Sequence, residues 1–238
     1  MLRKLTLALL LTLPSMAVAI DLEGYYITAK GGVSKTFNTG VTSFVDAVGN
    51  FPFLNEDLGT GSAFGFSVGK YLTDSFRLEL EAIKRAGYEY DVRATDADFT
   101  NVSEKAKIQT EALFINGFYD FQPFTMSNTA ITPYLGGGVG ISRNKMGTDV
   151  QHSNGLANGF TIDGNTINQF AYKLSAGTLV SLTDGLSLDV NYQYVNLGAF
   201  KGGTEVLRRG AFFQTLQRPT NGGVIKTQEL MVGLQYKF

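Results

Sequence analysis

Apolar and polar residues alternate with a period of two along much of the chain. Between Leu186 and Tyr194, Leu, Val and Tyr occupy every second position, while Ser, Asp, Asn and Gln fill the positions between them. Segments 76–82 and 229–238 alternate in the same way. Successive side chains of a β-strand point to opposite faces, so each segment predicts a strand with one apolar and one polar face. The pattern predicts eight strands, at about 23–37, 62–72, 75–92, 105–121, 131–146, 168–182, 185–197 and 223–238.

The connections between these strands differ systematically in length. The sequence Leu-Thr-Asp-small occurs at 72–75 and again at 182–185, and Asp followed by a small residue is typical of tight turns. A third turn, around 122–130, is slightly longer. The other four connections, at about 38–61, 93–104, 147–167 and 198–222, are long. An even number of strands with short turns at one end and long loops at the other is typical of outer-membrane barrels.

The N-terminal segment predicts export. Arg3 and Lys4 precede a short apolar run at 5–13, and Ala17-Val18-Ala19 offers a small-x-small cleavage site. This run is too short to cross a hydrocarbon core of about 30 Å. We therefore expect a cleaved signal peptide at 1–19 and a single barrel domain at 20–238.

The fold class follows from export and alternation together. A soluble β-sandwich also alternates, but an export signal and aromatic residues near strand ends favour a membrane barrel. We predict an all-β, eight-stranded antiparallel up-and-down transmembrane β-barrel, with short periplasmic turns and four long extracellular loops. The fourth strand is the hardest to orient: we expect the odd-numbered residues from Leu113 to Phe121 to face lipid and Glu111 to lie near the outer rim, and the opposite orientation stays open.

Composition narrows the class without naming an activity. Charged residues make up only 17% of the chain, against about a quarter in soluble domains, and 28 residues are Gly. There is no Cys, which excludes disulfide scaffolds and thiolate metal sites. A net charge of −1 gives no reason to expect nucleic acid binding, and nothing in the sequence calls for a cofactor.

Four motifs resemble the small outer-membrane barrels of the opacity-protein and surface-antigen group. They are the Pro-Tyr-Leu-Gly-Gly-Gly-Val-Gly run at 133–140, the Asn-x-x-Tyr-Asp-Phe ending at 116–121, the segment 182–194, and a C-terminus with Tyr236 and Phe238. The resemblance implies an eight-stranded barrel in the bacterial outer membrane, with loops at the cell surface and, in some members, adhesion to host cells. It also implies that Tyr236 and Phe238 form the signal read by the barrel-assembly machinery.

Charged residues on the polar faces of the strands are expected to meet inside the barrel. Paired carboxylates can perform acid–base chemistry only beside a substrate cavity, and side chains largely fill the interior of an eight-stranded barrel. We therefore expect an interior salt-bridge network that plugs the lumen, with a narrow pore for ions or small solutes as the alternative. The predicted members are Arg77, Glu79, Glu81, Arg85, Lys173, Asp189, Glu229 and Lys237.

Catalysis has weak support in the sequence. His152 is the only histidine, and it lies in a polar stretch that we interpret as a loop. A catalytic dyad needs a third group that fixes the histidine, and one histidine cannot build a typical zinc site. We expect no enzyme; a lipid-acting or proteolytic barrel is the remaining alternative from that class.

The long loops are the best candidates for recognition. The first loop is unusually apolar and contains Phe51 and Phe53, so it either folds onto the barrel mouth or contacts a partner. The fourth loop has four basic residues against Glu205 alone, a local charge of +3: Lys201, Arg208, Arg209 and Arg218. This loop suits lipopolysaccharide phosphates or sulfated host glycans, although a simply solvated basic loop is the alternative. We predict a monomeric surface protein with a structural or adhesin-like role.

Overall fold

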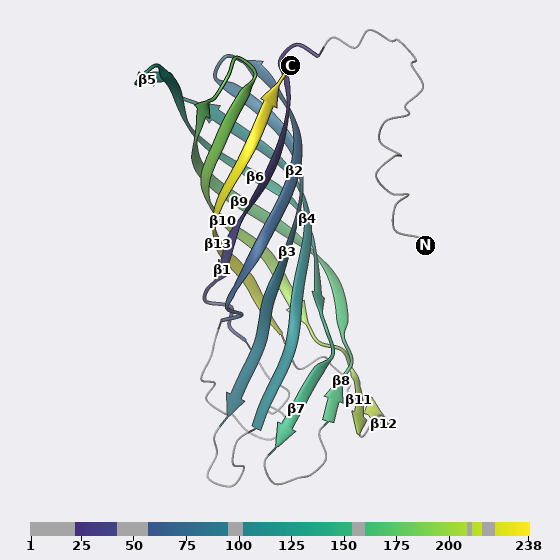
Figure 1. The fold of residues 1–238 in the computed structure, drawn as a ribbon. Coiled ribbons are helices and arrows are strands. Elements are labelled where there is room, and N and C mark those ends of the chain that lie inside the picture. The colour runs from purple at the N-terminus through teal and green to yellow at the C-terminus, as the bar shows by residue number, and fades with distance from the viewer. Residues whose placement is uncertain (1–21, 42–56, 95–101, 154–159, 209–210, 216–221) are drawn as a thin grey trace, which may run out of the picture.

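Eight long antiparallel strands form a closed barrel in the computed structural model, which describes residues 22–41, 57–94, 102–153, 160–208, 211–215 and 222–238 (Figure 1). Each strand pairs with its neighbours along the chain, and the first pairs with the last, so the sheet closes without an edge in the wall. The eight are β1 (Tyr25–Thr36), β2 (Thr60–Thr73), β3 (Phe76–Ala94), β4 (Val102–Asp120), β6 (Thr129–Met146), β9 (Asn165–Ser181), β10 (Leu186–Lys201) and β13 (Gly222–Lys237). The predicted fold class is confirmed.

Side chains alternate between the outer wall and the lumen, as the sequence pattern predicts. On β4, Leu113 and Ile115 are exposed on the outer wall, whereas Phe114 and Asn116 are fully buried inside. The fourth strand therefore has the expected orientation, and Glu111 lies exposed on the outer wall. The strands are 12–19 residues long, more than the 9–11 residues that a barrel strand needs to cross a bilayer.

The two Leu-Thr-Asp turns are held by threonine rather than by aspartate. The hydroxyl of Thr73 accepts a hydrogen bond from the Ser75 amide at 3.3 Å, and the hydroxyl of Thr183 accepts one from the Leu186 amide at 3.2 Å. The sequence motif pointed instead to the aspartates as the residues typical of these turns. The third turn contains an extra strand, β5 (Phe124–Met126), which pairs with the start of β6 and projects from the barrel end that carries the C-terminus (Figure 1).

Glycines on β6 make room for large side chains from β4. A Cβ atom on Gly136 would lie 2.2 Å from the Phe118 ring, and one on Gly138 would lie 2.0 Å from Oδ1 of Asn116. The inward-facing glycines of this strand therefore give way to side chains that cross the narrow lumen. The glycine-rich run therefore follows from packing inside the barrel.

Short strands extend the sheet beyond the barrel at the end opposite the C-terminus (Figure 1). They are β7 (Asp149–Ser153), β8 (Phe160–Ile162), β11 (Glu205–Arg208) and β12 (Ala211–Thr215). β7 pairs with the outer end of β4, and the order continues through β8 and β11 to β12. The third and fourth connections were predicted to be loops without strands. This was wrong for the four segments, which form an outer sheet.

Several expectations lie outside the described residues, among them the signal peptide at 1–19 and the apolar centre of the first loop, with Phe51 and Phe53. Within the described residues, no helix has the length and hydrophobicity that a membrane span would need.

Candidate functional site

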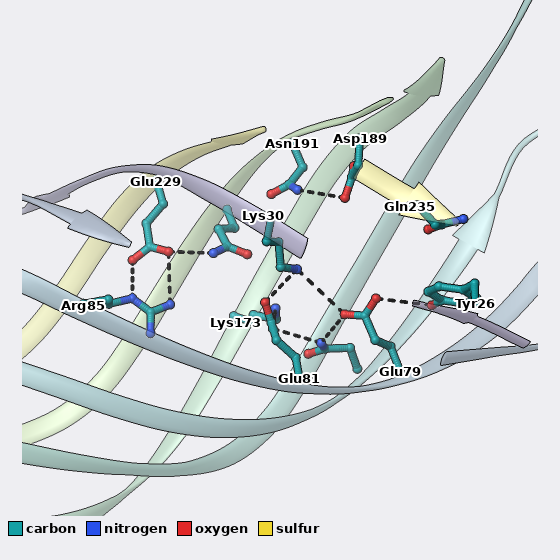
Figure 2. Close-up of polar contacts among 12 residues, drawn as sticks. Tyr26, Lys30, Glu79, Glu81, Arg85, Lys173, Asp189, Asn191, Glu229 and Gln235 are labelled. Atoms are coloured by element: carbon teal, nitrogen blue, oxygen red, sulfur yellow. Dashed lines mark hydrogen bonds and ion pairs between the residues drawn. The ribbon is translucent and has the colours of Figure 1, made fainter. Parts of the chain in front are cut away.

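The lumen holds a layered network of buried charged residues (Figure 2). The layer nearest the extracellular end of the barrel, the end opposite the C-terminus, is centred on Glu229 of β13. Nε and Nη2 of Arg85 donate to its two carboxylate oxygens at 2.5 and 3.0 Å, the forked geometry that makes Arg–carboxylate pairs strong. Ser34, Gln193 and Thr227 donate to the same carboxylate at 2.6–2.8 Å. Glu229 thus joins four strands: β1, β3, β10 and β13.

The middle layer is centred on Glu81 of β3. Nζ of Lys30 on β1 lies 2.6 Å from one carboxylate oxygen, and Nζ of Lys173 on β9 donates to the other. The side-chain amide of Asn116 donates to both Glu81 and Glu79 at 3.1 Å. Because Glu81 and both lysines are almost completely buried, two cations from different strands neutralise a carboxylate that water cannot reach.

Arg77 forms the layer nearest the periplasmic end. Its Nε lies 3.0 Å from the Asp120 carboxylate, and Nη1 donates to the side chain of Gln235 at 3.2 Å. The guanidinium carbon lies 4.4 and 4.6 Å from the ring centroids of Phe118 and Tyr134. The guanidinium therefore combines an ion pair with cation–π contacts, which Arg makes better than Lys.

Asp189 has hydroxyl and amide donors rather than a cation next to it. The Tyr134 hydroxyl donates to its carboxylate at 2.6 Å, and the Asn191 amide donates at 3.3 Å.

The lumen charges described by the structure nearly balance. They are the cations Lys30, Arg77, Arg85 and Lys173 and the carboxylates Glu79, Glu81, Asp120, Asp189 and Glu229.

The structure places all but one of the predicted lumen residues in this network. The exception is Lys237, which lies exposed where β13 ends, with Nζ 4.6 Å from the ring centroid of Tyr71. It has the inward orientation of Gln235, but the strand ends before another layer of side chains can enclose it. Sequence reasoning missed Lys30 and Asp120, although the alternation of their strands turns both side chains inward.

An apolar cluster lies inside the barrel beyond the Glu229 layer. Tyr90 and Phe200 meet edge to face with ring centroids 6.5 Å apart, and Leu58 and Val41 are buried in the same cluster. Val41 and Leu58 flank the first long loop. Both described ends of that loop therefore fold into the barrel mouth, whereas the apolar centre to which the two alternatives refer lies outside the described residues.

The network fills the described part of the lumen with paired, buried side chains. Glu81 and Arg85 are fully buried, and their partners come from strands that are not adjacent to β3. A substrate cavity beside the carboxylates would be needed for acid–base chemistry. Among the residues that the structure describes, no group of three or more His, Asp or Glu side chains is placed to hold a metal ion.

The remaining predicted residues lie at the two ends of the molecule. At the periplasmic end, the rings of Tyr236 and Phe238 lie on the outer wall with centroids 5.1 Å apart. At the outer end, Lys201 is exposed where β10 ends and Arg208 belongs to β11, whereas Arg209 and Arg218 lie outside the described residues. His152 belongs to β7, in register with Ser103 of β4, so its interpretation as a loop residue was wrong.

Comparisons with a family model and with individual proteins point to the same family. The model of the outer membrane protein beta-barrel domain matches residues 5–238. Outer membrane protein PagN of Salmonella typhimurium is 28% identical over 197 residues, covering 76% of this chain and 78% of PagN. A putative adhesin of Rickettsia prowazekii is 30% identical over 176 residues, covering 71% of each chain.

Solved structures support the fold. Neisserial surface protein A aligns with a TM-score of 0.53 and 16% identity, covering 91% of this chain and 98% of that protein. OprG from Pseudomonas aeruginosa aligns with a TM-score of 0.51 and 13% identity, covering 91% and 96% of the two chains. The closed eight-stranded barrel, its alternating wall and the match over nearly the whole length agree: the chain belongs to the outer membrane protein beta-barrel family.

Proposed function

We propose that this protein is an adhesin of the bacterial cell surface, and that its extracellular sheet and loops form the binding surface. The observation that carries the proposal is the contrast between the two parts of the molecule. Buried ion pairs close the lumen, whereas four short strands extend the sheet beyond the barrel on the outer side. Recognition by this protein therefore uses groups above the membrane, and it requires no catalysis.

The relatives support this role. One is named a putative adhesin of Rickettsia prowazekii, and another is an outer-membrane protein. The narrow pore, the alternative from the sequence, has no comparable support, because fully buried side chains such as Glu81 and Arg85 occupy the lumen.

The fourth connection suggests the class of ligand. Lys201, Arg208, Arg209 and Arg218 lie within it with Glu205 as the single acid, so its charge is +3. We propose that the ligand is an anionic glycan of the host surface, because sulfate and carboxylate groups accept the forked hydrogen bonds of Arg. The protein acts as a monomer in this proposal, since one chain carries the whole surface.

Adhesion of cells that display the protein to cultured host cells tests the proposal directly. Arg208→Ala with Arg209→Ala should reduce adhesion, and adhesion by the parent should fall between low and physiological salt, since salt screens exposed charges beyond about 8 Å at 0.15 M. Lys35→Ala with Lys226→Ala is the matched control, because it removes two positive charges from the outer wall of β1 and β13 and leaves the outer sheet unchanged.

Two outcomes would distinguish a failure of the proposed glycan ligand from a failure of the proposed adhesin role. Equal adhesion by the arginine variant and the parent at both salt concentrations would refute the glycan ligand. Adhesion no greater than that of cells without the protein would refute the adhesin role itself.

A further inference from the structure

The outer wall of the barrel carries a polar cluster directly beside apolar residues on β3, β4 and β6. Lys84 pairs in register with Glu111, and Glu111 pairs in register with Arg143. All three side chains are exposed on the outer wall. This row runs across three adjacent strands, on the half of the wall farther from the C-terminus.

The polar row marks the place where the lipid-facing band ends. Two positions closer to the periplasm, the same strands carry Ala82, Leu113 and Ile141, again in register. Leu113 and Ile141 are both more than half exposed, as expected for residues that face lipid tails. The cluster therefore lies at the boundary between the hydrocarbon region and the polar groups of the outer leaflet.

Two adjoining hollows give this boundary a shape. An apolar hollow of about 730 Å³ runs along the wall between Phe64, Phe66, Leu113 and Ile141. The hollow forms because Ala82, the outward residue between Phe66 and Leu113, has only a methyl side chain and leaves the space between its larger neighbours unfilled. A smaller hollow of about 190 Å³ is lined only by polar residues: Lys84, Gln109, Glu111, Arg143 and Lys145. Lys84, Glu111 and Arg143 line both hollows.

The charges of the polar hollow leave two cations without an anion. Nζ of Lys84 lies 3.2 Å from the Glu111 carboxylate, so these two side chains largely satisfy each other. Arg143 and Lys145 make no ion pair with any residue that the structure describes. With three cations and one carboxylate, the hollow has a net charge of +2, and the carboxylate is held on the Lys84 side.

We propose that this site binds a phosphorylated, multiply acylated glycolipid of the lipid A class from the outer leaflet. A phosphate group occupies the polar hollow, where it receives the forked hydrogen bonds of Arg143 and the point charge of Lys145. An acyl chain lies along the apolar hollow over Ala82. The two hollows match the two chemistries of one amphipathic anion, and they lie on the barrel wall, apart from the fourth connection that is proposed to bind glycans.

Native mass spectrometry of the refolded protein in detergent micelles, titrated with bisphosphorylated hexa-acyl lipid A, tests the phosphate half of the site. The variant Arg143→Gln with Lys145→Gln should weaken binding by about tenfold or more, because it removes two charge-assisted contacts. The control is Lys35→Gln with Lys226→Gln, which removes the same charge from the outer wall of β1 and β13. It should bind like the parent.

The acyl half of the site needs its own variant and its own probes. Ala82→Phe fills the apolar hollow with a side chain that the lipid-facing wall tolerates, and it should weaken binding of the same lipid while both cations remain. Lipid A without phosphates should bind the parent about tenfold more weakly, and inorganic phosphate at the same concentration should not displace the lipid. Parent-like binding by the Arg143 and Lys145 variant, or equal loss in the control, would overturn the proposed site.

Discussion

The Glu229 layer offers the most demanding test of the lumen network. In Glu229→Leu, the carboxylate that accepts both bonds of Arg85 is lost, and so is the acceptor for Ser34, Gln193 and Thr227. Arg85 is fully buried and would keep an uncompensated charge. Removing one partner of a buried ion pair costs about 3–5 kcal/mol, and two further donors without an acceptor, Gln193 and Thr227, place the expected loss in the upper part of this range, since Ser34 can still bond the Tyr88 hydroxyl.

Urea unfolding of the refolded protein in lipid vesicles measures this loss. The chain has no Trp, so the transition is followed by far-ultraviolet circular dichroism and by the heat-modifiable mobility of the folded barrel in gels. The double variant Arg85→Met with Glu229→Leu removes the charge together with its partner. It should recover more than half of the lost free energy, because well-packed apolar residues often replace a buried ion pair at little cost.

An exposed ion pair provides the control for this experiment. Lys84 and Glu111 lie 3.2 Å apart on the outer wall, with more than half of each side chain exposed. Glu111→Leu should therefore change the free energy of unfolding by no more than about 1 kcal/mol. If Glu229→Leu cost as little as this control, or if the double variant were less stable than the single one, Glu229 would not organise the lumen as we argue.

Four further results are expected. Gly138→Ala should destabilise the barrel by about 1–3 kcal/mol in the same urea assay, since its Cβ would lie 2.0 Å from a buried amide oxygen, whereas Gly117→Ala, with no atom closer than 3.6 Å, should cost less. Leu174→Arg places a charge on the lipid-facing wall and should cost about 2–4 kcal/mol, and a stability equal to that of the parent would contradict the outward orientation of β9. Phe238→Asp should reduce the folded barrel recovered in outer-membrane fractions, and an equal reduction in Phe121→Asp, another exposed aromatic residue, would argue against a specific C-terminal signal. Planar bilayers containing the refolded parent should show no steady conductance steps, because side chains close the lumen; regular open steps would restore the pore hypothesis.

The sequence was sufficient to predict the barrel because the alternation that marks each strand can be recognised within that strand alone. Lipid on one side and packed polar groups on the other impose a period of two on every crossing strand, so each of the eight strands could be placed to within a few residues. Even the fourth strand, with Phe114 and Phe118 on its inner face, had its orientation recovered from the outward apolar set. Turn chemistry was less accessible, since both Thr and Asp accept hydrogen bonds from nearby amides.

The sequence predicted most of the residues that lie in the lumen but not which of them form ion pairs with one another. Alternation places Glu81 and Glu229 inside, yet it cannot show that Glu81 meets Lys30 and Lys173 while Glu229 meets Arg85. Those partners depend on how far each strand is staggered against the next around the closed barrel, a property of all eight strands together. Lys237 shows the same limit, because its orientation is inward but its position lies beyond the last layer.

The outer sheet escaped prediction for a different physical reason. β7, β8, β11 and β12 lie in water above the membrane, so no lipid face imposes an apolar position at every second residue. Backbone pairing with the end of β4 organises these segments, and backbone hydrogen bonds leave no pattern in the side chains. The same freedom suits a recognition surface, because residues there can change without affecting the wall.

The separation between residues that stabilise the barrel and residues proposed to bind ligands follows from the small size of the barrel. Eight strands enclose a lumen so narrow that a carboxylate such as Glu81 meets cations from β1 and β9 at once, and side chains fill the described layers of the interior. Under the two proposals, stability and recognition depend on different residues: the buried layers provide stability, and we propose that the outer sheet and the polar boundary of the wall provide recognition. Substitutions in the lumen should therefore change unfolding before they change binding, and substitutions at Arg208 or Arg143 should do the reverse.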